Sequence, residues 1–274
     1  MSPNIFAKNQ KFLMLALDHL GSFKTVINPT NPEQVTKEQI ISLKTELISS
    51  LKHLFSGVLI DSDFGLPAYN NTNTDKPFML RCEKSDYEEK EGERITKIEY
   101  SAKELKKQGS VGAKMLMYFD PYGKFCDENI GIAKNYLDQC KAEQLPFFLE
   151  IVTYSATKKD FETSEYVEKS LQMFIEQQVI PDVWKLEYPG DIVSCHKVKE
   201  LVKNTPWILL TRGGSFETFS SHLKDAVKAN CAGFLAGRAL WQDVNTFKDE
   251  ERVNFLNTEL PRRFELISKI VNNY

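Results

Sequence analysis

The stretch Asp182-Val-Trp-Lys-Leu-Glu-Tyr-Pro189 places a lysine in the middle of a strand-like pattern that ends in the turn signal Pro189-Gly190. Side chains alternate between the two faces of a strand, so Lys185 shares one face with Val183 and Glu187. A lysine on a buried sheet face costs free energy unless it is paired or used chemically. A desolvated lysine also titrates low enough to act as an amine nucleophile toward a carbonyl group. The octet therefore predicts either a buried ion pair or a reactive amine.

Chain length and charge limit the possible domain organisation and argue against two classes of partner. The chain has 274 residues, which is enough for one α/β barrel or for two ordinary domains. The 35 Lys and Arg residues nearly balance the 38 Asp and Glu residues, and no block of like charge dominates. We therefore expect no nucleic-acid partner and no membrane partner.

The cysteines and the apolar runs indicate the cellular compartment of the protein. The five cysteines are odd in number and form no CxxC pair, which favours reduced thiols. The first residues lack the apolar core of a signal peptide, and no apolar run approaches the ~18 residues of a membrane span. These features predict a cytoplasmic protein.

Short apolar runs alternate with amphipathic stretches along the whole chain. The expected strands are Lys11–Asp18, Gly57–Asp61, Pro77–Glu83, Ala113–Asp120, Pro146–Tyr154, Asp182–Tyr188, Trp207–Thr211 and Gly233–Gly237. The expected helices are Thr36–Phe55, Ser101–Lys107, Glu128–Glu143, Ser164–Gln178, Ile192–Lys203, Phe216–Ala229 and a final segment, Asn245–Val271, with a break at Pro261. The charged stretch Lys84–Lys97 is expected to be a long solvent loop, with or without a helical part.

This alternation of strands and helices predicts a parallel sheet. Eight repeats in about 250 residues fit a single (β/α)8 TIM barrel that spans residues 1–274. A doubly wound sheet is the second choice, because the phosphate fingerprint GxGxxG is missing after the first strand.

Working residues of a TIM barrel lie at the C-terminal ends of its strands. The polar side chains at those ends here are Asp18, His19, Asp61, Glu83, Lys84, Tyr118, Asp120, Glu150, Lys185, Glu187, Thr211, Arg212 and Arg238. Most single charged residues in such places are solvated or anchor a loop. Lys185 differs, because apolar neighbours flank it and a barrel lumen would surround it.

Two further residues extend the site that Lys185 suggests. Lys114 would disfavour protonation of both lysines if it lies close to Lys185, or it forms an ion pair with a carboxylate such as Glu150 or Glu187. Glu150 lies in an apolar strand. Burial would raise its pKa and suit it to carry protons, whereas ion pairing would do the opposite. The sequence leaves both pairs of alternatives open.

The last two strands carry a phosphate signal. Thr211-Arg-Gly-Gly214 follows one strand and Ala236-Gly-Arg238 follows the next. Loops after the seventh and eighth strands of a barrel commonly bind phosphate through backbone N–H groups, and Arg212 or Arg238 would add bidentate contacts. Metal chemistry has less support, because the four histidines show no ligand spacing, and we expect no metal and no cofactor.

In order and spacing, these motifs resemble the class I tagatose-1,6-bisphosphate aldolases and the related sulfofructosephosphate aldolases. The matching segments are Leu15–Ser22, Val58–Ala68, Cys82–Ser85, Lys114–Pro121, Phe148–Glu150, Asp182–Glu187 and Gly233–Arg238. The context of Lys185 and the Thr211-Arg-Gly-Gly214 turn also resemble the 5-dehydro-2-deoxyphosphogluconate aldolases.

The resemblance implies a TIM barrel that cleaves a phosphorylated ketose to dihydroxyacetone phosphate and an aldehyde. It makes Lys185 the Schiff-base lysine, Glu150 the proton-transfer carboxylate and Lys114 a lysine beside the reacting centre. It gives Asp18 contact with substrate hydroxyl groups, and we expect the neighbouring His19 to contact the substrate as well. It gives the phosphate contacts to Thr211, Gly213, Gly237 and Arg238. From its place in the same turn, we expect Arg212 to contact the phosphate as well. A homo-oligomer is compatible with a barrel of this type.

One position departs from the family pattern. The family's first-strand motif, D-x-R-G-S, has an arginine where this chain has Leu20, so a cation that serves the far end of the substrate is missing. Arg212 is one candidate to replace it. The departure supports a catalytically silent sugar-phosphate-binding barrel as an alternative function. A metal-dependent aldol reaction is a third hypothesis, and it predicts loss of activity with a chelator.

Overall fold

Eight parallel strands form a closed barrel in the computed structural model, which describes residues 1–274 apart from the side chain of Asp249. The strands are β2 (Lys11–Leu17), β3 (Gly57–Ile60), β4 (Phe78–Arg81), β7 (Ala113–Phe119), β8 (Phe147–Thr153), β9 (Val183–Leu186), β10 (Trp207–Leu209) and β11 (Gly233–Ala236). Each pairs in parallel with the next, and β11 pairs with β2 to close the ring. All eight predicted strands are confirmed, and so is the TIM barrel; the open sheet is excluded.

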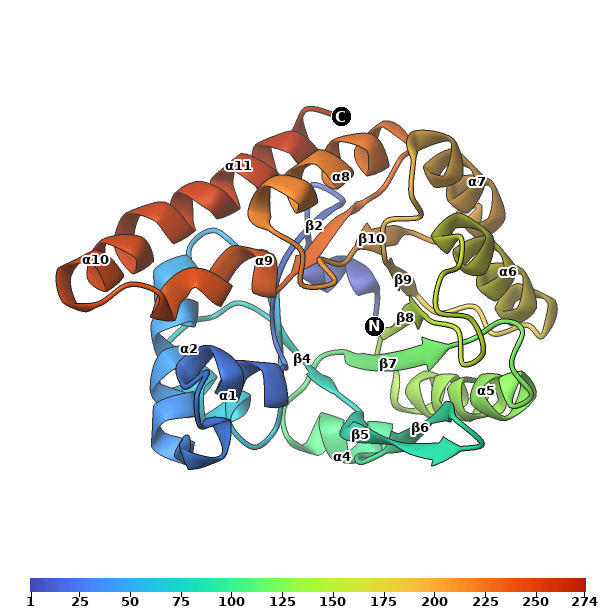
Figure 1. Cartoon of the computed structure of the whole chain (residues 1–274), viewed down its shortest axis with the longest axis horizontal. Helices are drawn as coiled ribbons and strands as arrows, with labels where there is room; N and C mark the ends of the chain where they lie inside the picture. Colours follow the sequence, from blue (N-terminus) through green and yellow to red (C-terminus); the bar gives the residue numbers. More distant parts are fainter.

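Helices surround the barrel, as Figure 1 shows. They are α1 (Gly21–Ile27), α2 (Lys37–Leu51), α3 (Gly65–Asn70), α4 (Ala102–Lys107), α5 (Cys126–Glu143), α6 (Thr163–Glu176), α7 (Ile192–Val202), α8 (Phe216–Lys228) and α9 (Arg238–Trp241), with 3-10 turns at Pro32–Gln34 and Gln242–Asn245. Side-chain caps start several of them: Thr36 and Gln39 form a capping box at α2, and Ser101 and Glu104 form another at α4. The short α1 and α3 lack a sequence pattern long enough to predict them.

The barrel lumen has an apolar lower half, near the N-terminal ends of the strands, and a charged upper half, near their C-terminal ends. Apolar side chains fill the lower half: Phe6, Phe12, Met14, Ala16, Leu59, Met79, Phe148, Val183, Ile208 and Leu235. Phe6 comes from the 3-10 turn Pro3–Phe6, which leads into β1 (Ala7–Lys8), a short antiparallel partner of β2. Because alternate residues of a strand face the lumen, the next inward positions toward the C-terminal ends include Arg81, Glu150 and Lys185.

The stretch Lys84–Lys97 is not a solvent loop. It belongs to an antiparallel hairpin of β5 (Glu83–Lys90) and β6 (Glu93–Ile98), with a turn at Glu91-Gly92 whose two residues have φ of 50° and 82°. Positive φ at both central residues is typical of the type I′ turn, whose twist matches a two-stranded ribbon. The strands satisfy each other's backbone, which lets the charged side chains remain in solvent.

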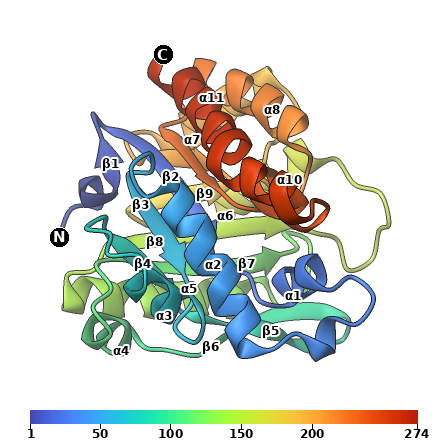
Figure 2. The same cartoon turned by 90° about the vertical axis from the view of Figure 1, so that its left-hand side faces the viewer.

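The C-terminal segment stays helical where a break was predicted at Pro261. It comprises α10 (Asp249–Asn254), a π-helical turn at Phe255–Glu259 and α11 (Leu260–Asn272). A π turn shifts the backbone hydrogen-bond register by one residue, directly before the proline that lacks an N–H group. Figure 2 shows α10 and α11 running along α2 and α8. In the described chain, no helix is long and apolar enough to cross a membrane.

Candidate active site

A cavity of about 530 Å³ lies at the C-terminal ends of the barrel strands. It is lined by nine of the ten residues that the sequence proposed for the site: Asp18, His19, Lys114, Glu150, Lys185, Thr211, Arg212, Gly237 and Arg238. The tenth, Gly213, lies directly against Arg238. The barrel thus brings together side chains from six strands or strand ends that are far apart in the sequence.

Lys185 is buried and reaches the floor of this cavity. It lies opposite Glu150 in the pairing of β9 with β8, so the two side chains face the lumen side by side. Its Nζ lies 2.7 Å from Glu150 Oε2 and donates a hydrogen bond to that oxygen. Lys185 therefore forms the predicted ion pair and also borders a cavity, whereas its role as a reactive amine stays a prediction.

Lys114 is surrounded by three carboxylates. Its Nζ lies 2.7 Å from Asp18 Oδ2, 2.6 Å from Glu83 Oε1 and 3.1 Å from Glu150 Oε2. Burial alone would lower the pKa of Lys114, but these carboxylates outweigh burial and raise the pKa well above its ordinary value. The idea that two neighbouring ammonium groups would disfavour protonation of both is therefore wrong for Lys114, which remains a cation.

Ion pairing also decides the charge of the carboxylates. Burial would raise the pKa of Glu150, but the ammonium groups of Lys185 and Lys114 outweigh it and lower that pKa. In the same way, Lys114 and other nearby cations hold the pKa of Asp18 well below its usual range despite burial. Both carboxylates are ionised at neutral pH, so Glu150 is available to accept a proton.

His19 is a neutral side chain at the cavity wall. Burial lowers the pKa of its imidazole to about 4, although the Asp18 carboxylate opposes the shift, with Nδ1 and Oδ1 3.6 Å apart. Its ring packs edge-on against Trp241. A Cβ at Gly237 would lie 2.8 Å from His19 Cε1, so glycine is required there for the ring to fit.

The two loops proposed to bind phosphate adjoin each other, but their arginines differ. Arg238 stacks its guanidinium over Gly213, where a Cβ would meet it at 2.9 Å and where φ is +74°. Arg238 Nε is buried without a hydrogen-bond partner among the described residues. Arg212 instead forms an ion pair with Glu187, and its Nη2 donates to Thr153 O at 3.0 Å. Arg238 is thus free for a ligand, whereas Arg212 is already bound.

Sequence reasoning gave no role to two buried residues of the site. Glu83, recognised only as a strand-end carboxylate, is a direct partner of Lys114. Arg81 was not singled out, although it precedes the Cys82–Ser85 motif and lines the cavity. Its inward position, two residues after Met79 in β4, was the available signal. In the described part of the chain, no group of three or more His, Cys, Asp or Glu side chains is arranged to hold a metal ion.

Known sequences match this chain over most of its length. A model of the DeoC/LacD family aldolases matches residues 12–243. The tagatose 1,6-diphosphate aldolase of Staphylococcus epidermidis is 31% identical over 261 residues, covering 83% of this chain and 79% of that protein. Its counterpart from Staphylococcus aureus strain JH9 is 32% identical with the same coverage.

Solved structures of aldolases share the fold. A Schiff-base-forming fructose-1,6-bisphosphate aldolase superposes with a TM-score of 0.70 at 19% identity, covering 98% of this chain and 97% of the other. An archaeal fructose 1,6-bisphosphate aldolase gives 0.70 at 18% identity, covering 99% and 97%. These similarities support the same barrel architecture.

Proposed function

This chain belongs to the DeoC/LacD family of aldolases, and from that premise we propose that it is a class I enzyme whose Lys185 forms a Schiff base. The proposed reaction cleaves a phosphorylated ketose between C3 and C4. The products are dihydroxyacetone phosphate and an aldehyde. The observation that carries the proposal is the contact between Lys185 and an ionised Glu150 at the floor of a cavity.

Schiff-base formation needs a neutral amine, and Glu150 is placed to provide it. The carboxylate takes a proton from the Lys185 ammonium across their 2.7 Å contact, and the free amine attacks the C2 carbonyl of the ketose. Glu150 then returns the proton to the carbinolamine hydroxyl, which leaves as water. The resulting iminium is positively charged and keeps Glu150 as its counter-ion.

The same carboxylate serves the cleavage step. Glu150 removes the proton from the C4 hydroxyl while the electrons of the C3–C4 bond move into the iminium, giving an enamine and the aldehyde. Glu150 next protonates C3 of the enamine, and water hydrolyses the new iminium to release dihydroxyacetone phosphate and restore Lys185. Each proton that Glu150 accepts is thus returned within the cycle.

Lys114 and Asp18 position the reacting groups in this proposal. Lys114 remains protonated between Asp18, Glu83 and Glu150, so it fixes all three carboxylates with one cation. Asp18 remains ionised and accepts hydrogen bonds from substrate hydroxyl groups, with His19 as its neutral neighbour. These charges hold the geometry of the site before substrate arrives.

The phosphate of the dihydroxyacetone half would bind between the last two strand ends. Arg238 offers a guanidinium whose Nε has no partner in the described structure, and Gly213 and Gly237 leave the backbone open beside it. Thr211 adds a hydroxyl that lines the cavity. Arg212 contributes by holding this loop through Glu187, which leaves direct phosphate contact mainly to Arg238.

Reduction with borohydride tests the proposal. The protein is incubated with dihydroxyacetone phosphate, reduced and digested, and we expect a reduced triose-phosphate adduct on Lys185 in the mass spectrum. Lys185→Met should lose the adduct, whereas the surface variant Lys197→Met should keep it. A folded wild-type protein that gives no adduct contradicts the mechanism. If ketose phosphates then raise its Tm without turnover, the silent binding barrel is the better description.

A further inference from the structure

Six cations line the cavity, and four already have a place in the proposed reaction or in the fold. Lys114 is held by three carboxylates, Lys185 carries the chemistry, Arg212 is paired with Glu187, and Arg238 faces the phosphate loops. The two that remain, Arg81 and Lys84, follow one another closely at the end of β4 and the start of β5. The proposed function gives neither of them a task.

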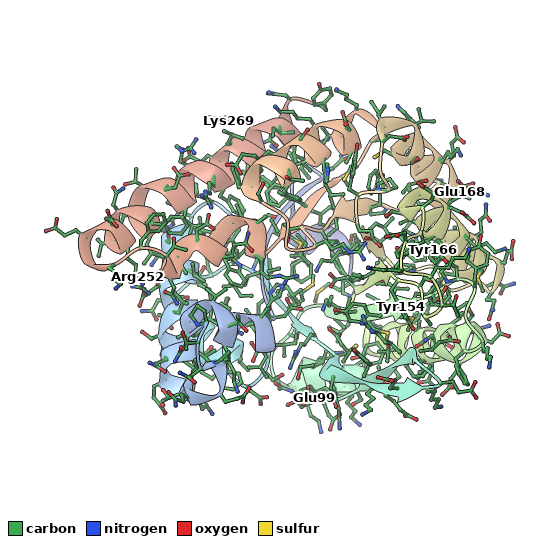
Figure 3. The ribbon with its side chains drawn as sticks, in the orientation of Figure 1. Glu99, Tyr154, Tyr166, Glu168, Arg252 and Lys269 are labelled. Carbon is green, nitrogen blue, oxygen red and sulfur yellow. The ribbon has the colours of Figure 1, made fainter. Side chains whose placement is uncertain are left out.

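Arg81 is a buried guanidinium with unused donors. It is 7% exposed, and its Nη1 donates a long hydrogen bond of 3.4 Å to Asp18 O. Its Nη2 lies 3.8 Å from Glu99 Oε2, which is an ion pair too long for a hydrogen bond. Most of its five N–H donors are therefore without an acceptor among the described side chains. Figure 3 labels Glu99, beside the hairpin on this side of the barrel.

Lys84 adds a second positive charge at the rim. It is exposed, lines the same cavity, and forms no ion pair with any described residue. The nearby carboxylate of Asp86 is 3.5 Å from Lys97 Nζ on the other strand of the hairpin. This part of the rim therefore presents cations whose charge is only partly compensated.

The strand order places these cations opposite the phosphate loops. Around the ring, β4 is third and β10 is seventh, so their ends lie across the lumen from each other in a barrel of eight strands. In the ring of strands, β9, which carries Lys185, lies between β4 and β10 and is next to β10. A ketose with its first phosphate at β10 and β11 and its carbonyl at Lys185 would extend its far end toward β4.

We propose that Arg81, assisted by Lys84, binds an anionic group at the far end of the substrate, either a phosphate or a sulfonate. The inference rests on the proposed function and adds to it the two residues that recognise the part of the substrate released as the aldehyde. Leu20, which lines the same cavity after the first barrel strand, carries no charge, so Arg81 and Lys84 are the two cations of the lining that remain for this anion. Glu99 keeps Arg81 oriented until the anion arrives.

The test uses the reverse reaction, because its aldehyde can be varied without fixing the stereochemistry of the ketose. Consumption of dihydroxyacetone phosphate is measured with glyceraldehyde 3-phosphate, with a sulfonate-bearing three-carbon aldehyde, and with uncharged glyceraldehyde. For Arg81→Met we expect kcat/KM to fall about 10- to 100-fold with the preferred anionic aldehyde and to change little with glyceraldehyde. Lys84→Met should show a selective loss of about 2- to 5-fold. The two anionic aldehydes decide between phosphate and sulfonate.

Matched variants make the result decisive. Lys97→Met removes a hairpin lysine that does not line the cavity, and it should leave all aldehydes unchanged. If Arg81→Met is unfolded, Arg81→Lys keeps the charge, loses the planar fork, and should still lose selectivity for the anionic aldehyde. Equal losses for charged and uncharged aldehydes overturn the inference. A selective loss in Arg212→Met but not in the Arg81 variants also overturns it.

Failure of this inference is distinguishable from failure of the proposed function. Dihydroxyacetone phosphate has no far end, so Arg81→Met should still form the borohydride-reduced adduct on Lys185. An adduct in wild type and variant without aldehyde selectivity contradicts the role of Arg81 alone. Absence of the adduct in both folded proteins contradicts the Schiff-base mechanism itself.

Discussion

Lys44 and Lys185 are both buried lysines paired with a carboxylate, yet their surroundings differ. Lys44 extends from α2, and its Nζ contacts Asp61, donates to Leu17 O at 2.7 Å and donates to His19 O at 3.1 Å. Three acceptors thus use all three of its N–H donors. Lys185 donates to Glu150 and has no second hydrogen bond to a described residue, and it borders the cavity.

Their carboxylate partners show the same contrast. Asp61 also accepts hydrogen bonds from the backbone N–H groups of Phe64 and Gly65, at 2.8 and 3.2 Å. Glu150 is shared between two ammonium groups and lines the cavity. Lys185 therefore differs from Lys44 in keeping unused donors beside a cavity, which is the arrangement that the proposed nucleophile requires. The Lys44 pair is sealed, and its function is to hold the chain on both sides of Asp18.

Removal of Lys185, the lysine that borders the cavity, should have the largest effect on activity. For Lys185→Met we expect activity to fall on the order of 10⁴-fold or more, because no other amine can replace the proposed nucleophile. The fold should persist, since Lys114 still pairs with Glu150. Steady-state rates and circular dichroism measure both effects. Near-normal turnover by the variant would show that Lys185 is not the nucleophile and does not differ from Lys44 in this respect.

Removal of Lys44 tests whether the buried Lys44–Asp61 ion pair serves stability rather than catalysis. Lys44→Met leaves Asp61 buried without its cation, and we expect the free energy of unfolding to fall by about 3–5 kcal/mol. The double variant with Asp61→Asn should regain part of this loss, because no buried charge remains. Urea unfolding measures the change, and kcat at low temperature should fall far less than in Lys185→Met. A stable Lys44→Met protein that lacks activity would place Lys44 with the reacting groups.

Much of the barrel could be predicted because its inner strands are apolar and its helices are amphipathic. The hairpin at Lys84–Lys97 could not, since its strands carry charges on both faces and show no apolar alternation. The π turn before Pro261 also escaped prediction, because the same proline is typical of a helix break.

The residues of the site could be predicted from the strand ends, but the ion pairs between them could not be predicted. Asp18, Glu83 and Glu150 reach Lys114 from three separate places in the sequence, and only the strand register brings them together. The same limit applies to Arg212, whose bond to Glu187 depends on the position of two neighbouring strand ends. Lys44 appears in the sequence as one more polar residue of a helix, although it is fully buried.

His19 joins the two regions and should give the smallest effect, one that depends on pH. Its carbonyl accepts from Lys44, while its ring faces the cavity with a pKa lowered to about 4. Between about pH 6.5 and 4 the unfolded chain binds a proton at His19 that the folded chain does not, so stability is present above this window and is lost as the pH falls through it.

His19→Asn removes this contribution and should flatten the dependence of unfolding free energy on pH. The side chain is 24% exposed, which limits the expected difference between pH 7 and pH 4.5 to about 1–2 kcal/mol. Urea unfolding of both proteins at the two pH values measures it. Asp18 contributes little to the difference, because in the unfolded chain the pKa of its carboxyl group is near the ordinary value of 3.8, below the lower of the two pH values. Parallel pH profiles would mean that His19 is protonated as readily in the folded chain as in water, and that the cavity wall is open to solvent at this residue.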